Sequence, residues 1–244
     1  MTPGARRKVG LAVAVLGVVA IASRSAGWLR AHGRHGRARP SPSHALGVDV
    51  SHHQGVIDWA RVAASGVRFA YVKASEGKDL RDARFDDNWA GASRAGLRVG
   101  AYHYFTLCSP GAAQAALFLS VVPDAPGALP PVLDLEYEGN CSRRPTPQEL
   151  ERELVAFDEA IERRYRRPPI LYATDAFRRD YLADVPWGEP DLWVRDVSRV
   201  LPLEPDGPWT LWQYDARGEV DGIDGPVDLS VLNGPAGALD HLAR

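Results

Sequence analysis

The stretch Pro131–Leu135 reads PVLDL, and Glu136 follows it directly. Apart from Asp134 the stretch is apolar, as expected for a strand that is buried on both faces of a parallel sheet. Side chains alternate along a strand, so Asp134 and Glu136 point to one face and Leu135 points to the other, toward the helices. Burying an unpaired carboxylate is costly, so two acids at the end of a buried strand indicate a functional site.

Seven similar runs lie on either side of this strand. They are Gly47–Ser51, Phe69–Ala74, Val99–Phe105, Ile170–Ala173, Leu192–Val197, Thr210–Tyr214 and Val227–Val231. Each is mostly apolar and rich in β-branched or aromatic residues, which favour strands. Together with Pro131–Leu135 they predict eight strands of one sheet.

Helical patterns follow each of the first five strands. They cover Trp59–Ser65, Arg84–Ala95, Gly111–Val122, Thr146–Tyr165 and Asp175–Leu182. The fourth begins with a capping box, in which Thr146 is the N-cap, Pro147 the first helical residue and Glu149 the third. After Leu182 the connections are rich in proline, glycine and aspartate, and they predict loops.

The order of elements is therefore five βα units followed by three β-strands. Eight strands that begin as βα repeats favour an α/β fold of the incomplete TIM-barrel type. A doubly wound open sheet is the alternative. The barrel is favoured because no glycine-rich phosphate-binding motif follows the first strand.

Barrel enzymes carry their catalytic groups at the carboxyl ends of the strands. The predicted ends carry Asp49, Glu76, His103, Asp134, Glu136, Tyr172, Asp196, Gln213 and Asp228. Because Asp134 and Glu136 lie so close, they do not easily ionise together, and one of them holds a proton near neutral pH. A protonated acid beside an ionised one is what glycosidic cleavage needs. Acids at other strand ends, Asp49 and Asp228, strengthen this interpretation.

Aromatic residues also gather near the strand ends, and two or three of them are expected to line a sugar-binding cleft. The residues expected to contact the substrate are Glu76, Tyr102, His103, Tyr172, Trp193 and Gln213. No metal site is expected at His52 and His53, because neighbouring side chains on a strand face opposite sides. Orienting hydrogen bonds are expected for these two histidines.

The N-terminus predicts the compartment. A basic start, Arg6 to Lys8, precedes an apolar run of about 14 residues, Val9–Ala22. This run suits a signal peptide and is short for a spanning helix. Residues 1–22 are therefore expected to be a signal peptide or membrane anchor, residues 23–45 a flexible linker and residues 46–244 the catalytic domain. The protein is expected to be secreted or anchored to the outer face of the cytoplasmic membrane.

Charge and cysteine content set further limits. The 244-residue chain has a formal net charge of -2, so no global basic field attracts nucleic acid. Its two cysteines, Cys108 and Cys141, form no C-x-x-C motif. They follow the third and fourth strands, which are neighbours in a parallel barrel. An exported chain is therefore expected to join them in a disulfide.

These residues resemble glycoside hydrolase family 25, the lysozymes also called N-acetylmuramidases. The resemblance extends from about Leu46 to Asn233. The matching segments are Gly47–Trp59 (GVDVSHHQGVIDW), Phe69–Gly77 (FAYVKASEG), Ala95–Phe105 (AGLRVGAYHYF), Pro130–Glu136 (PPVLDLE), Trp209–Tyr214 (WTLWQY) and Val227–Ser230 (VDLS). Several ordered motifs at natural spacing make the resemblance specific.

The resemblance implies cleavage of the β-1,4 bond between N-acetylmuramic acid and N-acetylglucosamine in peptidoglycan. It implies Glu136 as the proton donor and Asp134 as the residue that orients the substrate's own acetamido nucleophile in a retaining reaction. Asp49 and Asp228 would tune charge and hold the sugar. No metal or cofactor is implied, and a monomer is expected. Ser230 departs from the Asn that often follows the last acid by two residues, and no repeat module for wall binding is present.

Two other functions fit the residues. One is a catalytically silent glycan-binding protein on the same scaffold, although all four acids are retained. The other is a metal-dependent barrel hydrolase that uses His103 together with Asp49, Asp134 and Glu136.

Overall fold

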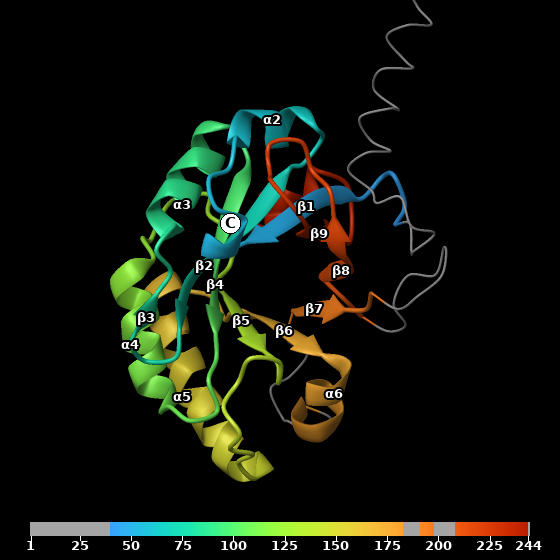
Figure 1. Ribbon diagram of the computed structural model, residues 1–244. Helices are drawn as coiled ribbons and strands as arrows, with labels where there is room; N and C mark the ends of the chain where they lie inside the picture. Colours follow the sequence, from blue (N-terminus) through green and yellow to red (C-terminus); the bar gives the residue numbers. More distant parts are fainter. Residues whose placement is uncertain (1–39, 183–190, 198–207, 244) are drawn as a thin grey trace, which may run out of the picture.

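The computed structural model describes residues 40–182, 191–197 and 208–243, which form a closed eight-stranded barrel (Figure 1). The barrel strands are β1 (Ala45–Val50), β2 (Phe69–Glu76), β4 (Arg98–Tyr104), β5 (Val132–Leu135), β6 (Ile170–Thr174), β7 (Leu192–Arg195), β8 (Leu211–Gly218) and β9 (Val227–Leu232). They follow one another round the barrel in this order, and β1 pairs with both β2 and β9. The predicted barrel is confirmed, and an open sheet is excluded.

Strand β9 runs against both of its neighbours. The barrel pairs from β1 through β8 are parallel, whereas β9 is antiparallel to β8 and to β1. A parallel crossover needs a dozen or more residues, and the connection at 219–226 is too short for one. Asp228 therefore reaches the carboxyl edge of the parallel strands from the amino end of its own strand. The sequence analysis wrongly placed it at a carboxyl end.

The five helices that the sequence predicts are present as α2 (Trp59–Ala64), α3 (Phe85–Arg94), α4 (Gly111–Val121), α5 (Pro147–Tyr165), and α6 (Asp175–Phe177) with its continuation η2 (Arg178–Leu182). The described residues also form η1 (His52–Gln54) and α7 (Ala238–Leu242). The capping box of α5 is present. The Thr146 hydroxyl accepts from the Glu149 amide, and the Glu149 carboxylate accepts from the Thr146 amide at 2.8 Å.

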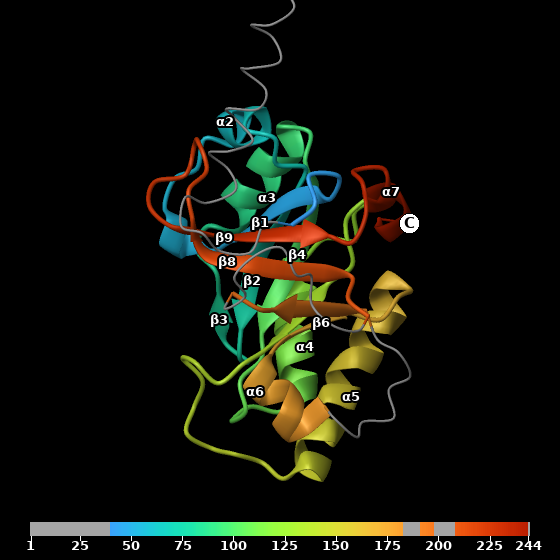
Figure 2. The ribbon, with the colours of Figure 1, turned by 90° about the vertical axis from the view of Figure 1, so that its right-hand side faces the viewer.

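Three short elements were not predicted. The 3-10 helix η1 carries His52 and His53 with ring centroids 4.0 Å apart, so these histidines do not face opposite sides of a strand as expected. Strand β3 (Leu80–Arg81) forms a hairpin with the end of β2. Helix α7 lies beside the C-terminus (Figure 2), and no side chain caps it. Its Leu239 and the following Ala243 are buried with the amino ends of the strands. Helix α7 thus closes the end of the barrel opposite the predicted active site.

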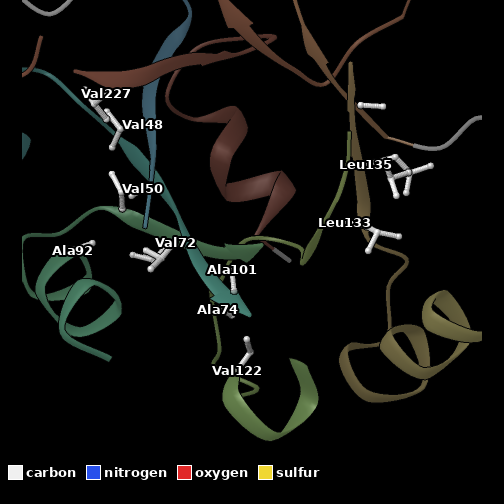
Figure 3. Close-up of a cluster of buried hydrophobic side chains, with 14 of the residues drawn as sticks. Val48, Val50, Val72, Ala74, Ala92, Ala101, Val122, Leu133, Leu135 and Val227 are labelled. Carbon is white, nitrogen blue, oxygen red and sulfur yellow. The ribbon is translucent and has the colours of Figure 1, made fainter. Parts of the chain in front are cut away.

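Apolar residues form two layers, one on each face of the barrel wall. The outer layer lies between strands and helices, and Figure 3 shows Val48, Val72 and Leu135 in it. The inner layer fills the barrel and includes Val132 and Ile170. Because the faces alternate, Leu135 packs outward while its two acidic neighbours point inward, as predicted.

Two glycines let aromatic rings fill the barrel. A Cβ at Gly47 would lie 2.2 Å from the ring of Phe69, and a Cβ at Gly100 would lie 2.2 Å from the ring of Tyr71. Both rings are fully buried. Because glycine has no side chain, each of these two positions leaves room for the large ring of a residue on the neighbouring strand.

The predicted disulfide is confirmed. Cys108 and Cys141 are bonded with a Cα–Cα distance of 6.3 Å. The bond joins the β4–α4 loop to the β5–α5 loop at the carboxyl edge of the barrel. Residues 1–22 and most of the predicted linker lie outside the described residues. Among the residues that are described, no helix combines the length and apolar character needed to span a bilayer.

Removing the disulfide should lower stability substantially. The bond closes a loop with a sequence separation of 33, which the chain-entropy relation values at about 3–4 kcal/mol. For a domain of this size we expect the double substitution Cys108→Ser, Cys141→Ser to lower Tm by roughly 7–14 °C. Thermal unfolding followed by circular dichroism measures this. Reduced wild-type protein is the control and should melt like the double variant; equal Tm for reduced and oxidised wild type would contradict the prediction.

Candidate functional site

Four acidic side chains converge at the carboxyl edge of the barrel. One cavity is lined by Asp49 on β1, Asp134 on β5, Glu136 directly after β5, and Asp228 on β9. Asp49 and Asp228 are directly opposite each other in the antiparallel pair of β1 and β9. The structure therefore brings together all four acids that the sequence analysis singled out.

Asp49 and Asp228 form a hydrogen-bonded carboxyl pair. Burial, the charge of Asp228 and the hydrogen bond between the two groups raise the pKa of Asp49 well above its usual range. Burial also raises the pKa of Asp228 to about 6, although the bond from Asp49 opposes that rise. A bond between two carboxyl groups needs one proton, and Asp49 is the group that holds it. The Ser230 hydroxyl donates to Asp49 over a long 3.4 Å.

Asp134 and Glu136 form a second coupled pair. Burial raises the pKa of Glu136 to about 7, with nearby carboxylates adding to the shift. Burial, and then the charge of Glu136, raise the pKa of Asp134 well above its usual range. The pair therefore keeps protons near neutral pH, and Glu136, with a pKa of about 7, gains and loses its own proton there. Within residues 40–182, 191–197 and 208–243, the buried Oδ1 atom of Asp134 has no hydrogen-bond partner.

Two cations balance these acids, and the sequence analysis missed both. The Lys73 ammonium lies 2.6 Å from Glu76 and stacks over the Tyr104 ring at 5.0 Å. Its charge lowers the pKa of both Asp134 and Glu136, in opposition to burial. A lysine inside the apolar run of β2 was the available signal, because buried strands rarely carry one. Arg195, at the end of β7, also lowers the pKa of Glu136.

Aromatic side chains form the wall of the cavity. Tyr102, Tyr172 and Trp193 line it together with the four acids. In the part of the chain that the structure describes, the buried Trp193 Nε1 atom has no hydrogen-bond partner. Gln213 accepts a 2.7 Å hydrogen bond from the Tyr172 hydroxyl and also hydrogen-bonds to Asp228. Of the residues expected to contact substrate, these three aromatics lie at the cavity, and Gln213 supports one of them.

Family 25 is identified by comparison with known proteins. The family model described as glycosyl hydrolases family 25 matches residues 48–223. The chain belongs to glycoside hydrolase family 25. It is 39% identical over 197 residues to YegX, an uncharacterized protein of Escherichia coli strain K12, with 77% of this chain and 69% of that protein covered.

Two further relatives have more informative names. The family 25 chain is 35% identical over 214 residues to Lysozyme M1 of Streptomyces globisporus, covering 81% of this chain and 71% of that protein. It is also similar to the solved structure of a family 25 glycosyl hydrolase from Bacillus anthracis. That match has a TM-score of 0.78 and 33% identity, and it covers 87% of this chain and 99% of the other.

His103 does not lie at the cavity of this family 25 domain. It is fully buried on the outer face of β4, where it packs against Phe157 and Phe118 of the helices. Its ring nitrogens bond to Ser75 at 2.9 Å and Gln114 at 3.1 Å. Tyr102 points inward, so its neighbour must point outward. His103 as a substrate-binding residue is therefore wrong, and a metal site combining it with the inward-facing acids is excluded by geometry.

Two polar residues occupy the rim of the site. Glu76 is partly exposed and paired with Lys73. The His52 Nδ1 atom lies 2.7 Å from the buried Asp82 carboxylate, which also accepts from the His52 amide at 3.0 Å. This orienting contact agrees with the expectation for the histidines. The sequence analysis did not single out Asp82 as a site residue, because Asp82 does not lie at the end of a predicted strand.

Arg195 should control the protonation of Glu136. Burial raises the pKa of Glu136 and the Arg195 charge lowers it, so the substitution Arg195→Gln should move that pKa above about 7. The carboxyl carbon of Glu136, followed by NMR in ¹³C-glutamate-labelled protein across a pH series, reports the change. Arg94→Gln, at the C-terminal end of α3, is the matched control and should leave the titration unchanged. A Glu136 pKa that stays constant or falls in Arg195→Gln would contradict the assignment.

Proposed function

We propose that this protein hydrolyses the β-1,4 bond between N-acetylmuramic acid and N-acetylglucosamine in bacterial peptidoglycan. The observation that carries the proposal is the pair formed by Glu136 and Asp134. Burial raises the pKa of Glu136 to about 7, so it can deliver a proton at neutral pH. Beside it, the buried Asp134 Oδ1 atom has no hydrogen-bond partner among the residues that the structure describes. Family membership supports peptidoglycan as the substrate.

The proposed reaction retains configuration and uses the substrate's acetamido group. Glu136 gives its proton to the glycosidic oxygen while the acetamido carbonyl oxygen bonds to the anomeric carbon. Asp134 accepts the acetamido N–H at its free Oδ1 and stabilises the positive charge that develops on the ring formed. Water then attacks the anomeric carbon, opens that ring and gives a proton back to the Glu136 carboxylate.

The remaining groups of the cavity hold the sugar. The carboxyl pair of Asp49 and Asp228 contributes one negative charge and hydrogen-bonding oxygens at the floor of the site. Tyr102, Tyr172 and Trp193 offer ring faces and edges to the sugar. Glu76 is assigned to the rim and Gln213 to support of Tyr172. We assign no metal or cofactor to this reaction.

We also propose that the enzyme acts outside the cytoplasm as a monomer. A disulfide and a cell-wall-acting family agree with an extracytoplasmic protein. In this proposal residues 1–22 export the chain or anchor it to the membrane, residues 23–45 link it, and residues 46–244 form the catalytic domain.

Glu136→Gln should fold normally and lose nearly all hydrolysis. The amide has the same shape but is a poor proton donor, and general acid catalysis contributes about two to four orders of magnitude. The matched control is Glu162→Gln, the same chemical change on an exposed side chain of α5 away from the cavity. The rate of muropeptide release from purified peptidoglycan is measured, and mass analysis of the new reducing ends identifies the bond. New reducing ends that carry N-acetylglucosamine would refute the proposal, and so would a fully active Glu136→Gln. A wild-type protein that binds peptidoglycan but does not cleave it would instead support a catalytically silent binding protein.

A further inference from the structure

The side chain of Asn140 makes four hydrogen bonds to main-chain groups. Its Nδ2 atom donates to the carbonyl oxygens of Phe105, at 2.8 Å, and Glu136, at 3.0 Å. Its Oδ1 atom accepts from the amides of Leu107, at 2.9 Å, and Cys141, at 3.0 Å. A primary amide has two N–H donors and two lone pairs, so the bonding capacity of Asn140 is filled.

These four bonds join two separate loops at the catalytic edge. Phe105 and Leu107 belong to the loop that follows β4, whereas Glu136 and Cys141 belong to the loop that follows β5. The disulfide joins the same two loops next to Asn140. A third connection nearby is the Tyr104 hydroxyl, which donates to the Glu138 carbonyl at 2.6 Å.

Glu136 depends on this arrangement more than the other acids do. Strand β5 ends at Leu135, so the main chain of Glu136 lies just beyond the ladder of strand pairs. Asp134, by contrast, lies within the ladder and pairs with Tyr104 and Tyr172 on the neighbouring strands. The carbonyl of Glu136 is held by Asn140 instead.

We propose that Asn140 is a positioning residue for Glu136, fixing the main chain of the proton donor against the disulfide-linked loop that follows β4. Asn140 acts through Glu136 and does not itself touch the reacting atoms. The proposal rests on the proposed function for its effect on catalysis. A displacement of about 1 Å in a catalytic group can lower a rate roughly a hundredfold, so a residue that sets this position controls turnover.

Loss of the Asn140 contacts should also change the environment of Glu136. The charged groups that face Glu136 are Lys73 on β2, Asp134 on β5, Glu138 on its own loop, Arg195 on β7 and Asp228 on β9. Burial is the largest cause of its raised pKa. A loop released from Asn140 exposes the carboxyl group to water, so the pKa of Glu136 should fall from about 7 toward that of an ordinary glutamate. The alkaline limb of the activity profile should move to lower pH with it.

The activity test compares Asn140→Ala and Asn140→Asp in the full chain. Both remove the donors to Glu136 and Phe105, and the aspartate keeps the shape and the acceptors. We expect each to lower kcat on purified peptidoglycan by at least tenfold, with KM changed less than about threefold. Asn233→Ala is the matched control, because it removes an amide bond to the Trp209 carbonyl, 3.0 Å long, at the opposite end of the barrel.

A second measurement does not need activity. NMR titration of ¹³C-glutamate-labelled protein should give a lower pKa for Glu136 in Asn140→Ala, which adds no charge, than in the wild type, and an unchanged pKa in Asn233→Ala. A variant with reduced Tm but wild-type kcat, pH profile and Glu136 pKa would overturn the proposal and leave Asn140 a purely structural residue. If the wild type fails to cut peptidoglycan, the proposed function fails, while the titration still decides whether Asn140 positions Glu136.

Discussion

Asp49 and Asp228 face each other across β1 and β9, the antiparallel pair that closes the barrel. Without this closure, the cavity would be open along one side and water would reach the acids from it. Closure removes that water, and desolvation becomes the largest cause of every raised pKa in the cavity. The reversed direction of β9 also brings Asp228 to the edge where the parallel strands end. The chemistry of the site thus depends on one strand pair.

Four buried acids would oppose folding if all were ionised. The fold tolerates them because protons are shared within the two carboxyl pairs and because two cations lie close by. Lys73 and Arg195 do not neutralise the site fully, since the pKa of Glu136 stays well above that of an exposed glutamate. This residual imbalance stores unfavourable electrostatic energy in the free protein, as is common in active sites.

Different interactions stabilise the barrel interior and the loops at its carboxyl edge. The barrel interior is held by ring packing on glycines, as with Phe69 against Gly47. The loops that follow β4 and β5 bury Phe105 and Leu107 in the outer apolar layer, and they are also joined to each other by a disulfide and by the fully bonded amide of Asn140. Covalent and polar contacts thus add to apolar packing in these loops. Glu136, the proposed proton donor, lies at the boundary between the barrel wall and these loops.

Local sequence patterns were sufficient to predict much of the fold. The period of two in PVLDL placed Asp134 and Glu136 on one face, and the capping box at Thr146 marked the start of α5; both signals act within a few residues. The structure also confirmed the Cys108–Cys141 disulfide, which followed from the order of the strands.

Other features needed the folded chain, because they depend on contacts between distant segments. His103 and Tyr102 are adjacent polar residues at one strand end, and only the closed barrel shows which of them faces inward. The direction of β9, the charge of Arg195 near Glu136 and the four bonds of Asn140 likewise join residues from different elements. A sequence determines the periodicity of each strand, but the side of the sheet that becomes the interior is decided when the strands pair.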